Sequence, residues 1–229
     1  MLTLITGASS NHFKTLLNFL IRNEPFIKPY RVVVYDLGLT EKENQVLTKN
    51  FPQYLHCKFD YSKYPDYFNI KIEAGQYAWK PVIIHEVAAK FGGYICWMDS
   101  GNLIYEDLRV LINVIKTHKI YTPRSSMHLK RWVHPGTLKY LNYIGNLFLR
   151  NRSGGYFACD YSLKFVKDFV NDWKNGALIK ECIAPEGSHR KNHRQDQAVL
   201  SVLFHQYQKK YKFPIKESIK CVTFYNDIK

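Results

Sequence analysis

Apolar and polar positions alternate along the chain in two regular ways. Three short runs of mostly apolar residues have the length of buried strands, and they cover residues 2–6, 31–35 and 55–59. Between the first two, residues 12–22 repeat apolar positions at a period of about 3.6, which predicts an amphipathic helix. A second helix is expected at 40–49, because Thr40 and Glu43 have the spacing of a capping box. The order strand-helix-strand-helix-strand predicts parallel strands joined by right-handed crossovers.

The rest of the chain continues this alternation less regularly. We expect helices at residues 79–90, 108–116, 138–148, 162–173 and 195–207, strands at 94–98, 156–159 and 221–224, a basic mobile loop at 116–131 and a polar loop at 184–192. Pro81 suits the first turn of its helix, which Gly92 and Gly93 end. The pattern predicts a single α/β domain over residues 1–229, with a mostly parallel central sheet flanked by helices. Ligands of such sheets bind beyond the carboxyl ends of the strands, so we expect the site there.

Composition narrows the class of protein. Of 229 residues, 46% are hydrophobic and 23% charged, which is typical of a globular chain. Lys and Arg number 33 against 19 Asp and Glu, and a net charge of +14 favours nucleic acid, phosphorylated small molecules or an acidic membrane surface as partners. We find no apolar run near the roughly 20 residues that span a bilayer and no secretory signal, so we expect a cytoplasmic protein without a transmembrane segment. Five scattered cysteines without a Cys-x-x-Cys pair predict reduced thiols and no thiolate zinc site.

The first strand ends in Thr-Gly-Ala-Ser-Ser-Asn-His-Phe, residues 6–13. Small residues let a ligand approach the backbone, and the following helix N-terminus favours phosphate or another anion. Short-chain dehydrogenases begin with the same Thr-Gly-Ala-Ser, and Tyr54 and Lys58 form a Tyr-x-x-x-Lys pair. That pair comes too early in the chain, however, and the turn lacks the further glycines of a G-x-G-x-x-G motif. A plain strand-to-helix turn with a helix cap remains an alternative.

Two further strands end in an acidic residue. Asp36 follows the second strand, where a carboxylate either binds the base or ribose of a nucleotide or caps the loop before Thr40. Residues 97–101, Trp-Met-Asp-Ser-Gly, place Asp99 beside two small residues. Hard divalent cations bind carboxylate together with diphosphate oxygens, but Gly101 stands where an Asp-x-Asp pair has its second acid. The structural alternative is a simple turn after a strand.

Residues 193–197, His-Arg-Gln-Asp-Gln, open a late helix. Asp196 near a helix N-terminus is favoured by the helix dipole whatever its function. In a site, the same carboxylate would hold or deprotonate a hydroxyl group, oriented by Arg194 and Gln195. Basic residues gather around this point, and they form either a solvated loop or a charged patch for a diphosphate leaving group: His189, Arg190, Lys191, His193 and Arg194.

Taken in order, these motifs resemble those of glycosyltransferases of the GT-A fold. The segments are TGASSNHF (6–13), VYDLGLT (34–40), YAWKP (77–81), WMDSG (97–101) and HRQDQAVLS (193–201), as in a glycosyltransferase-like family of animals, bacteria and large DNA viruses. The resemblance implies a hexosyltransferase that moves a sugar from a nucleotide diphosphosugar, a UDP-sugar above all, to a hydroxyl of a glycan, a lipid-linked or a protein acceptor. It also implies a nucleotide-binding half at about 1–101 and an acceptor-side half at about 102–229.

The same resemblance assigns roles to single residues. Donor binding is expected from Thr6, Gly7, Ala8, Asn11, Asp36, Lys80, Asp99, Ser100 and Gly101, with Asp36 near the base or ribose and Lys80 near the phosphate or sugar. The sugar and acceptor side is expected at Gly154, Gly155, His193, Arg194 and Gln195, with Asp196 as the catalytic base of an inverting reaction or as a positioning group in a retaining one. Mn²⁺ or Mg²⁺ would bind Asp99, but Gly101 removes the second acid. Lys80, His193 and Arg194 are then expected to replace part of the cation's charge.

Two other functions fit the charge or the missing acid. A basic nucleic-acid-binding protein or nuclease fits the charge, but the basic residues are spread along the chain and match no named binding motif. A protein that binds nucleotide sugar without transferring it fits the absence of an acid at Gly101.

Overall fold

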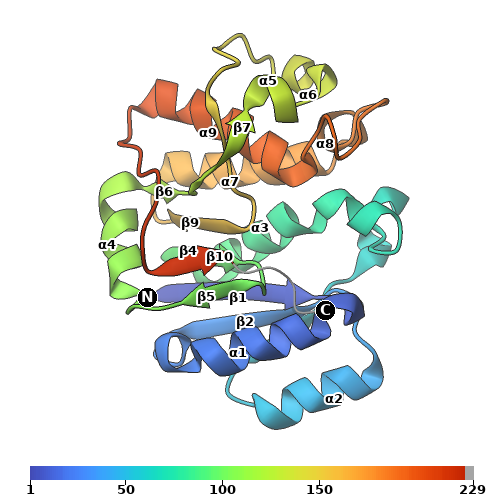
Figure 1. Ribbon diagram of the computed structural model, residues 1–229, viewed down its shortest axis with the longest axis vertical. Coiled ribbons are helices and arrows are strands. Elements are labelled where there is room, and N and C mark those ends of the chain that lie inside the picture. The colour runs from blue at the N-terminus through green and yellow to red at the C-terminus, as the bar shows by residue number, and fades with distance from the viewer. Residues whose placement is uncertain (225–229) are drawn as a thin grey trace.

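A six-stranded sheet forms the centre of the computed structural model, which describes residues 1–224 (Figure 1). Its order is β3-β2-β1-β4-β9-β6. The strands are β1 (Leu2–Ala8), β2 (Arg31–Asp36), β3 (Leu55–Lys58), β4 (Tyr94–Met98), β6 (Ile120–Tyr121) and β9 (Tyr156–Asp160). The first four lie parallel, while β9 runs antiparallel to both β4 and β6. The carboxyl ends of the parallel strands therefore share one edge of the sheet.

Helices cover both faces of this sheet (Figure 1). The longer ones are α1 (Phe13–Ile27), α2 (Glu41–Asn50), α3 (Trp79–Phe91), α4 (Arg109–His118), α7 (Lys164–Ala177) and α9 (Gln195–Tyr211). Shorter helical turns are η1 (Ser10–His12), η2 (Tyr61–Lys63), η3 (Asp66–Phe68), η4 (Glu73–Tyr77), α5 (Leu129–Trp132), α6 (Pro135–Tyr140) and α8 (Lys180–Ile183). In Figure 1, α1 and α2 lie below the sheet, and α7 and α9 lie above it.

Alternate residues of the strands feed two separate apolar layers, as the pleat of a strand requires. Ile5 and Trp97 pack with the buried side chains of α3, α7 and α9 on one face. Leu4 and Cys96 pack with α1 and α4 on the other. Because both faces are covered, the inner strands are apolar throughout, which is what made them recognisable in the sequence.

Two small antiparallel sheets lie outside the central one. The first joins β5 (Asn102–Ile104) to β10 (Val222–Phe224), so the predicted strand near residue 222 exists. The second joins β7 (Arg124–His128) to β8 (Arg150–Arg152). Among the described residues no helix combines the length and apolar character needed to cross a membrane. All five cysteines are free thiols, as expected.

Two predicted elements are wrong. The expected mobile loop at 116–131 instead contains β6, β7 and α5, because strand partners more than 20 residues away in the chain pair with it. The expected helix at 138–148 stops at Tyr140, the last residue of α6. Asn142 then takes a left-handed backbone conformation with φ of 48°, which no helix can continue. Three short elements, β5, β8 and α8, lie where no helix or strand was expected. Other differences are of extent: α1 runs past Pro25 to Ile27, and α9 runs to Tyr211.

Candidate active site

A cleft of about 560 Å³ opens at the carboxyl ends of β1 and β4. Its walls come from the β1–α1 turn, the loop after β2, the segment before α3, the turn after β4 and Gly155 at the start of β9. Eight residues expected from the sequence line it: Gly7, Ala8, Asn11, Lys80, Asp99, Ser100, Gly101 and Gly155. Segments far apart in the chain therefore meet at one edge of the sheet.

The wall of the cleft beside β1 and β2 is held by contacts between two strand-end turns. The Ser10 backbone N–H and hydroxyl both donate to the Gly38 carbonyl, at 3.2 and 3.0 Å. Gly7 lies so close to β2 that a Cβ there would be 2.8 Å from the Tyr35 carbonyl oxygen. Only a residue without a side chain permits this approach, so the glycine at the strand end is required by packing as well as by access to the cleft.

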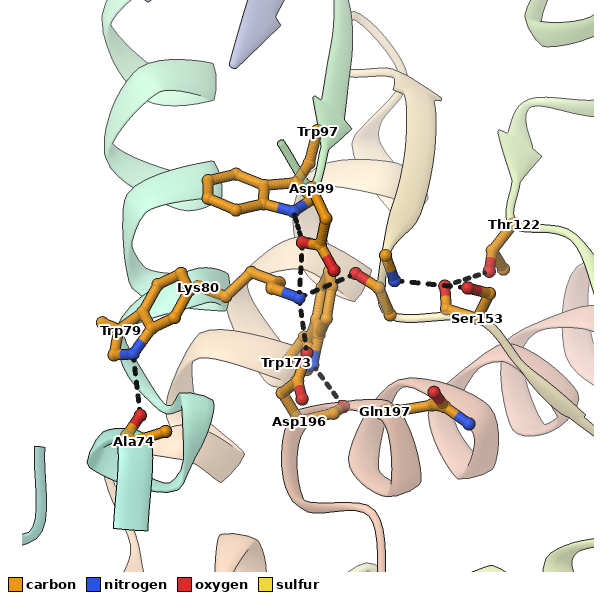
Figure 2. Close-up of polar contacts among 12 residues, drawn as sticks. Ala74, Trp79, Lys80, Trp97, Asp99, Thr122, Ser153, Trp173, Asp196 and Gln197 are labelled. Atoms are coloured by element: carbon orange, nitrogen blue, oxygen red, sulfur yellow. Dashed lines mark hydrogen bonds and ion pairs between the residues drawn. The ribbon is translucent and has the colours of Figure 1, made fainter. Parts of the chain in front are cut away.

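A buried lysine at the floor of the cleft joins two carboxylates: Asp99, which lines the cleft, and Asp196, which does not. Lys80, in the first turn of α3, is almost fully buried, and its Nζ lies 3.0 Å from Asp99 Oδ1 and 3.5 Å from Asp196 Oδ2. It also donates to the Gly154 carbonyl at 3.0 Å. Figure 2 shows the ammonium between the two acids, which come from the turn after β4 and the first turn of α9. The Trp173 indole fixes Asp196 from behind by donating to its backbone carbonyl at 3.1 Å.

The charges of this cluster depend on one another. Burial alone would lower the pKa of Lys80, but the attraction of Asp196 and Asp99 outweighs it and the pKa is raised, so the ammonium stays charged. Burial raises the pKa of Asp196 to about 6, and Asp99 raises it too, against the opposing effect of Lys80. Asp196 therefore titrates close to neutral pH, where a group that transfers protons is most effective.

Two glycines bring the β8–β9 turn against both carboxylates. A Cβ on Gly154 would be 2.8 Å from Asp196 Oδ2, and one on Gly155 would be 2.9 Å from Asp99 Oδ2. The oxygen facing Gly154 is buried and receives no hydrogen bond of good geometry; Lys80 is an ion-pair partner at 3.5 Å. Asp196 Oδ2 thus keeps an unused lone pair at a position that the β8–β9 turn covers.

Asp99 faces the cleft more openly than Asp196. Its side chain is 47% exposed, and its Oδ1 accepts hydrogen bonds from the Trp97 indole at 2.7 Å and from Lys80. Asp99 Oδ2 remains free of these bonds. In residues 1–224 no three His, Cys, Asp or Glu side chains are grouped so that they could hold a metal ion. The protein groups present do not fit a divalent cation held by this chain alone, because that would need several oxygen ligands and Lys80 already occupies one side of Asp99.

The segment before α3 supplies a wall that the sequence did not indicate. Residues 73–77 all have positive φ, at 47°, 54°, 61°, 51° and 54°, and so form a left-handed turn in which only Gly75 is a glycine. Such conformations cost of order 1–3 kcal/mol each for ordinary residues and persist only where the surroundings enforce them. The Trp79 indole clamps the turn by donating to the Ala74 carbonyl at 3.0 Å, as Figure 2 shows. Ala74, Tyr77 and Trp79 line the cleft.

Two expected donor residues lie behind the cleft wall. Thr6 is fully buried inside β1 and is not among the lining residues. Asp36 Oδ1 accepts from the Gly38 and Leu39 backbone N–H groups at 2.7 and 2.6 Å, and its Oδ2 accepts from Asn44 at 2.9 Å. Of the two sequence alternatives for Asp36, the geometry matches the loop cap, because this carboxylate is used up in shaping the turn that carries Gly38.

Four residues expected on the acceptor side do not line the cleft: Gly154, His193, Arg194 and Gln195. His193 is fully buried; its Nε2 lies 2.8 Å from the Ile183 carbonyl and its Nδ1 accepts from the His134 backbone at 3.2 Å. Burial lowers the pKa of His193 to about 4, so the ring carries no charge at neutral pH and cannot replace a cation. The Arg194 guanidinium lies 4.2 Å above the Trp132 ring. Gln195 is buried at the start of α9.

Comparisons of sequence and structure with known proteins identify the fold of the chain. A family model described as a protein of unknown function (DUF1647) matches residues 2–85, which end before Asp99 and Asp196. No protein of curated function matches the chain in sequence. The galactosyltransferase LgtC, solved with donor and acceptor sugar analogues, has a similar structure at 15% identity and a TM-score of 0.58, over 88% of this chain and 70% of that one.

Two other solved structures share this architecture. Mouse xyloside xylosyltransferase 1 aligns at 10% identity and a TM-score of 0.52, over 94% of this chain and 83% of that one. The bifunctional glycosyltransferase WbbM aligns at 13% identity and a TM-score of 0.53, over 89% of this chain but 37% of that one. The chain therefore has the GT-A fold, a mixed α/β domain with a mostly parallel central sheet and flanking helices.

Proposed function

We propose that this protein is a glycosyltransferase that uses a nucleotide diphosphosugar, with UDP as the nucleotide, and transfers the hexose to a hydroxyl group. The observation that carries this proposal is the Lys80 ammonium held between Asp99 and Asp196 at the floor of a cleft. A buried cation there meets the need of the reaction, since the diphosphate that leaves must have its developing charge stabilised.

The donor is proposed to lie along the carboxyl ends of β1 and β4. Gly7, Ala8 and Asn11 leave room for the nucleoside, and Tyr77 and Trp79 offer aromatic faces on the opposite wall. Lys80 then faces the diphosphate from the first turn of α3, where the helix dipole adds positive potential. In this proposal Lys80 takes the part of the charge that Mn²⁺ or Mg²⁺ would supply, and the chain divides near residue 101 into nucleotide and acceptor sides.

The acceptor is proposed to reach the site over Gly154 and Gly155. Any side chain at these positions would collide with Asp196 or Asp99, so only glycine lets the β8–β9 turn pack this closely against the two carboxylates that the acceptor hydroxyl is proposed to approach. We assign to Asp196 the role of accepting the hydroxyl proton, because Oδ2 has a free lone pair and the pKa of about 6 leaves the group ionised at neutral pH. Bond making at the anomeric carbon passes through an oxocarbenium-like transition state.

The fold neighbours support the reaction class. The LgtC structure holds donor and acceptor sugar analogues, and a further structure of LgtC carries an active-site glutamine-to-glutamate substitution. Here Gln195 and Gln197 flank Asp196. Gln197 donates to the Ser125 hydroxyl at 3.3 Å, which ties the first turn of α9 to β7.

The test is a panel of UDP-, GDP- and TDP-sugars, measured by thermal shift and by nucleotide release, with Mn²⁺ and with a chelator. We expect stabilisation and turnover with UDP-sugars in both conditions. Asp99→Ala should weaken UDP binding, whereas Asp168→Ala should not; Asp168 is a matched control, because its side chain is 43% exposed and also pairs with a lysine.

Each rival function predicts a different result. Stabilisation by nucleotide without any release, under every acceptor and metal condition, would identify a binding protein that does not transfer sugar. If no nucleotide binds but nucleic acid is retained at about 0.2 M salt, where phosphate-driven binding weakens sharply, the basic surface serves nucleic acid and the proposal fails.

A further inference from the structure

A second cleft, of about 580 Å³, lies at the other end of α9 from Asp196. Its walls are the loop between α6 and β8 and the last turns of α9. Since Asp196 and Lys209 are separated by most of α9, a rise of 1.5 Å per residue places the two ends roughly 20 Å apart. This surface is therefore separate from the candidate active site. In Figure 1 the loop that follows α6 forms the top of the molecule.

Large apolar side chains stand exposed on this loop. Ile144 is 97% exposed and Phe148 is 63% exposed, and both line the cleft together with Leu149 and Ile215. Hydrogen bonds nevertheless fix the conformation of this loop. The Gln206 side chain donates to the Leu141 carbonyl at 2.8 Å, and the Phe148 backbone donates to the Asn146 side chain at 2.8 Å. Exposed apolar side chains that a structured loop holds in solvent mark an interaction surface.

Cations surround these apolar side chains. Arg150 and Lys209 line the same cleft, and the Lys130 ammonium lies 5.4 Å above the Phe148 ring. Residues 108–159 contain no aspartate or glutamate at all. The acid that faces this cleft among its lining residues is Glu217, and Arg152 neutralises it through two contacts of 3.1 and 3.2 Å. The surface is therefore apolar at its tip and positive around it.

We propose that this surface docks the protein on an anionic lipid bilayer, with Ile144 and Phe148 entering the interface and Lys130, Arg150 and Lys209 contacting lipid phosphate. Apolar side chains that enter the acyl boundary and a ring of cations that meets anionic headgroups are the two components of peripheral membrane binding. Nucleic acid would use the cations but would give an exposed isoleucine no apolar partner. The proposal is independent of the sugar-transfer reaction.

The experiment is co-sedimentation of the full chain with vesicles of phosphatidylcholine alone or with 30% phosphatidylserine. We expect binding to the mixed vesicles only. The double variant Ile144→Ser/Phe148→Ser should bind roughly tenfold more weakly or worse. The matched control Ile21→Ser/Leu55→Ser removes two exposed apolar side chains from α1 and β3, and this variant should bind like the wild type. Lys130→Gln/Arg150→Gln should lose roughly fivefold for each cation removed.

Three results would overturn the proposal. The first is a wild-type protein that stays in the supernatant with mixed vesicles. The second is equal loss in the loop variant and in the control, or no loss in either. The third is a wild-type dimer that becomes a monomer in Ile144→Ser/Phe148→Ser by light scattering, which would assign the surface to self-association. An unchanged melting temperature in each variant shows that the fold is intact.

Discussion

Replacement of Lys80 by methionine tests the central cluster most directly. Methionine has a similar length and no charge, so the substitution removes the ammonium from between Asp99 and Asp196 and keeps most of the packing. The lost contacts are the two ion pairs, of 3.0 and 3.5 Å, and the hydrogen bond to the Gly154 carbonyl. What remains is a buried carboxylate, Asp196, with no cation beside it.

The expected loss of stability in Lys80→Met depends on whether Asp196 takes up a proton. Removing one partner of a buried ion pair typically costs about 3–5 kcal/mol. Here the cost is limited, because Asp196 can take up a proton. Without Lys80, burial and the charge of Asp99 raise its pKa from a value already near 6, and the Gln197 backbone hydrogen bond is the one lowering effect that remains. We therefore expect a loss of about 3 kcal/mol at pH 8 that becomes smaller toward pH 5.5.

The assay is urea unfolding of four proteins at pH 5.5 and pH 8: wild type, Lys80→Met, Asp196→Asn and the double variant. Because the two residues are in contact, their effects should not add, and the double variant should regain about 2 kcal/mol relative to Lys80→Met at pH 8. Binding of UDP should stay at least tenfold weaker in the double variant, since stability is restored but the cation is not. Lys90→Met, at the exposed end of the same helix, is the control.

Three results would refute this reasoning. Lys80→Met as stable as wild type at pH 8 would mean that the ion pairs contribute nothing. Purely additive variants would mean that Lys80 and Asp196 do not interact. Unchanged affinity for UDP in Lys80→Met would remove Lys80 from the donor site even if the stability effects appear as expected.

Three further predictions use the same measurements. The pKa of Asp196 is higher in the folded state (about 6) than in the unfolded state (about 3.9), so its favourable contribution to stability is complete below about pH 4 and is lost as the pH rises through 6. The free energy of unfolding of Asp196→Asn, measured in urea, should therefore rise relative to that of the wild type by up to about 3 kcal/mol between pH 4 and pH 8. In the wild type, kcat/KM should fall below about pH 6 as Asp196 takes up a proton, and Asp196→Asn should have no activity. Gly155→Ala should lower turnover by tenfold or more with little change in Tm, because its Cβ would lie 2.9 Å from Asp99 Oδ2; normal turnover would show that the turn can move aside. His193→Ala should cost about 2–4 kcal/mol in urea at pH 7 yet leave the Kd for UDP unchanged, since the buried ring bonds to the backbone at both nitrogens; a weakened Kd would show that His193 contributes to nucleotide binding.

The first half of the chain was predictable because its signals are local. Buried parallel strands are apolar throughout, and the Thr40–Glu43 capping box is visible in four consecutive residues; the structure has both hydrogen bonds of that box. The carboxyl ends of neighbouring parallel strands must share an edge, so β1 and β4 bring Gly7 and Asp99 to one cleft. The fold class could be stated from such patterns alone, and it is confirmed.

The other half depends on long-range pairing that no local pattern shows. β7 reads Arg-Ser-Ser-Met-His and has no apolar alternation, yet it pairs with β8 across more than 20 residues of chain. The left-handed turn at 73–77 is equally hidden, since only Gly75 signals positive φ. The pairing of Lys80 with Asp196 joins residues more than 100 positions apart. Sequence motifs identified both residues, but only the fold shows that they form one ionic cluster.

The charge of Lys80 and the lack of an acid at Gly101 both bear on whether a metal ion could bind at Asp99. A divalent cation bound to Asp99 would lie roughly 4–5 Å from the Lys80 ammonium, which is itself 3.0 Å from Asp99 Oδ1. Even at an effective dielectric constant of about 20, a double and a single positive charge at that distance repel by about 7 kcal/mol. That repulsion opposes metal binding at Asp99, and the position that would supply a second carboxylate is Gly101. A fixed ammonium between two acids and a strand end with a single acid are therefore mutually consistent, as expected if Lys80 supplies the positive charge of the proposed site.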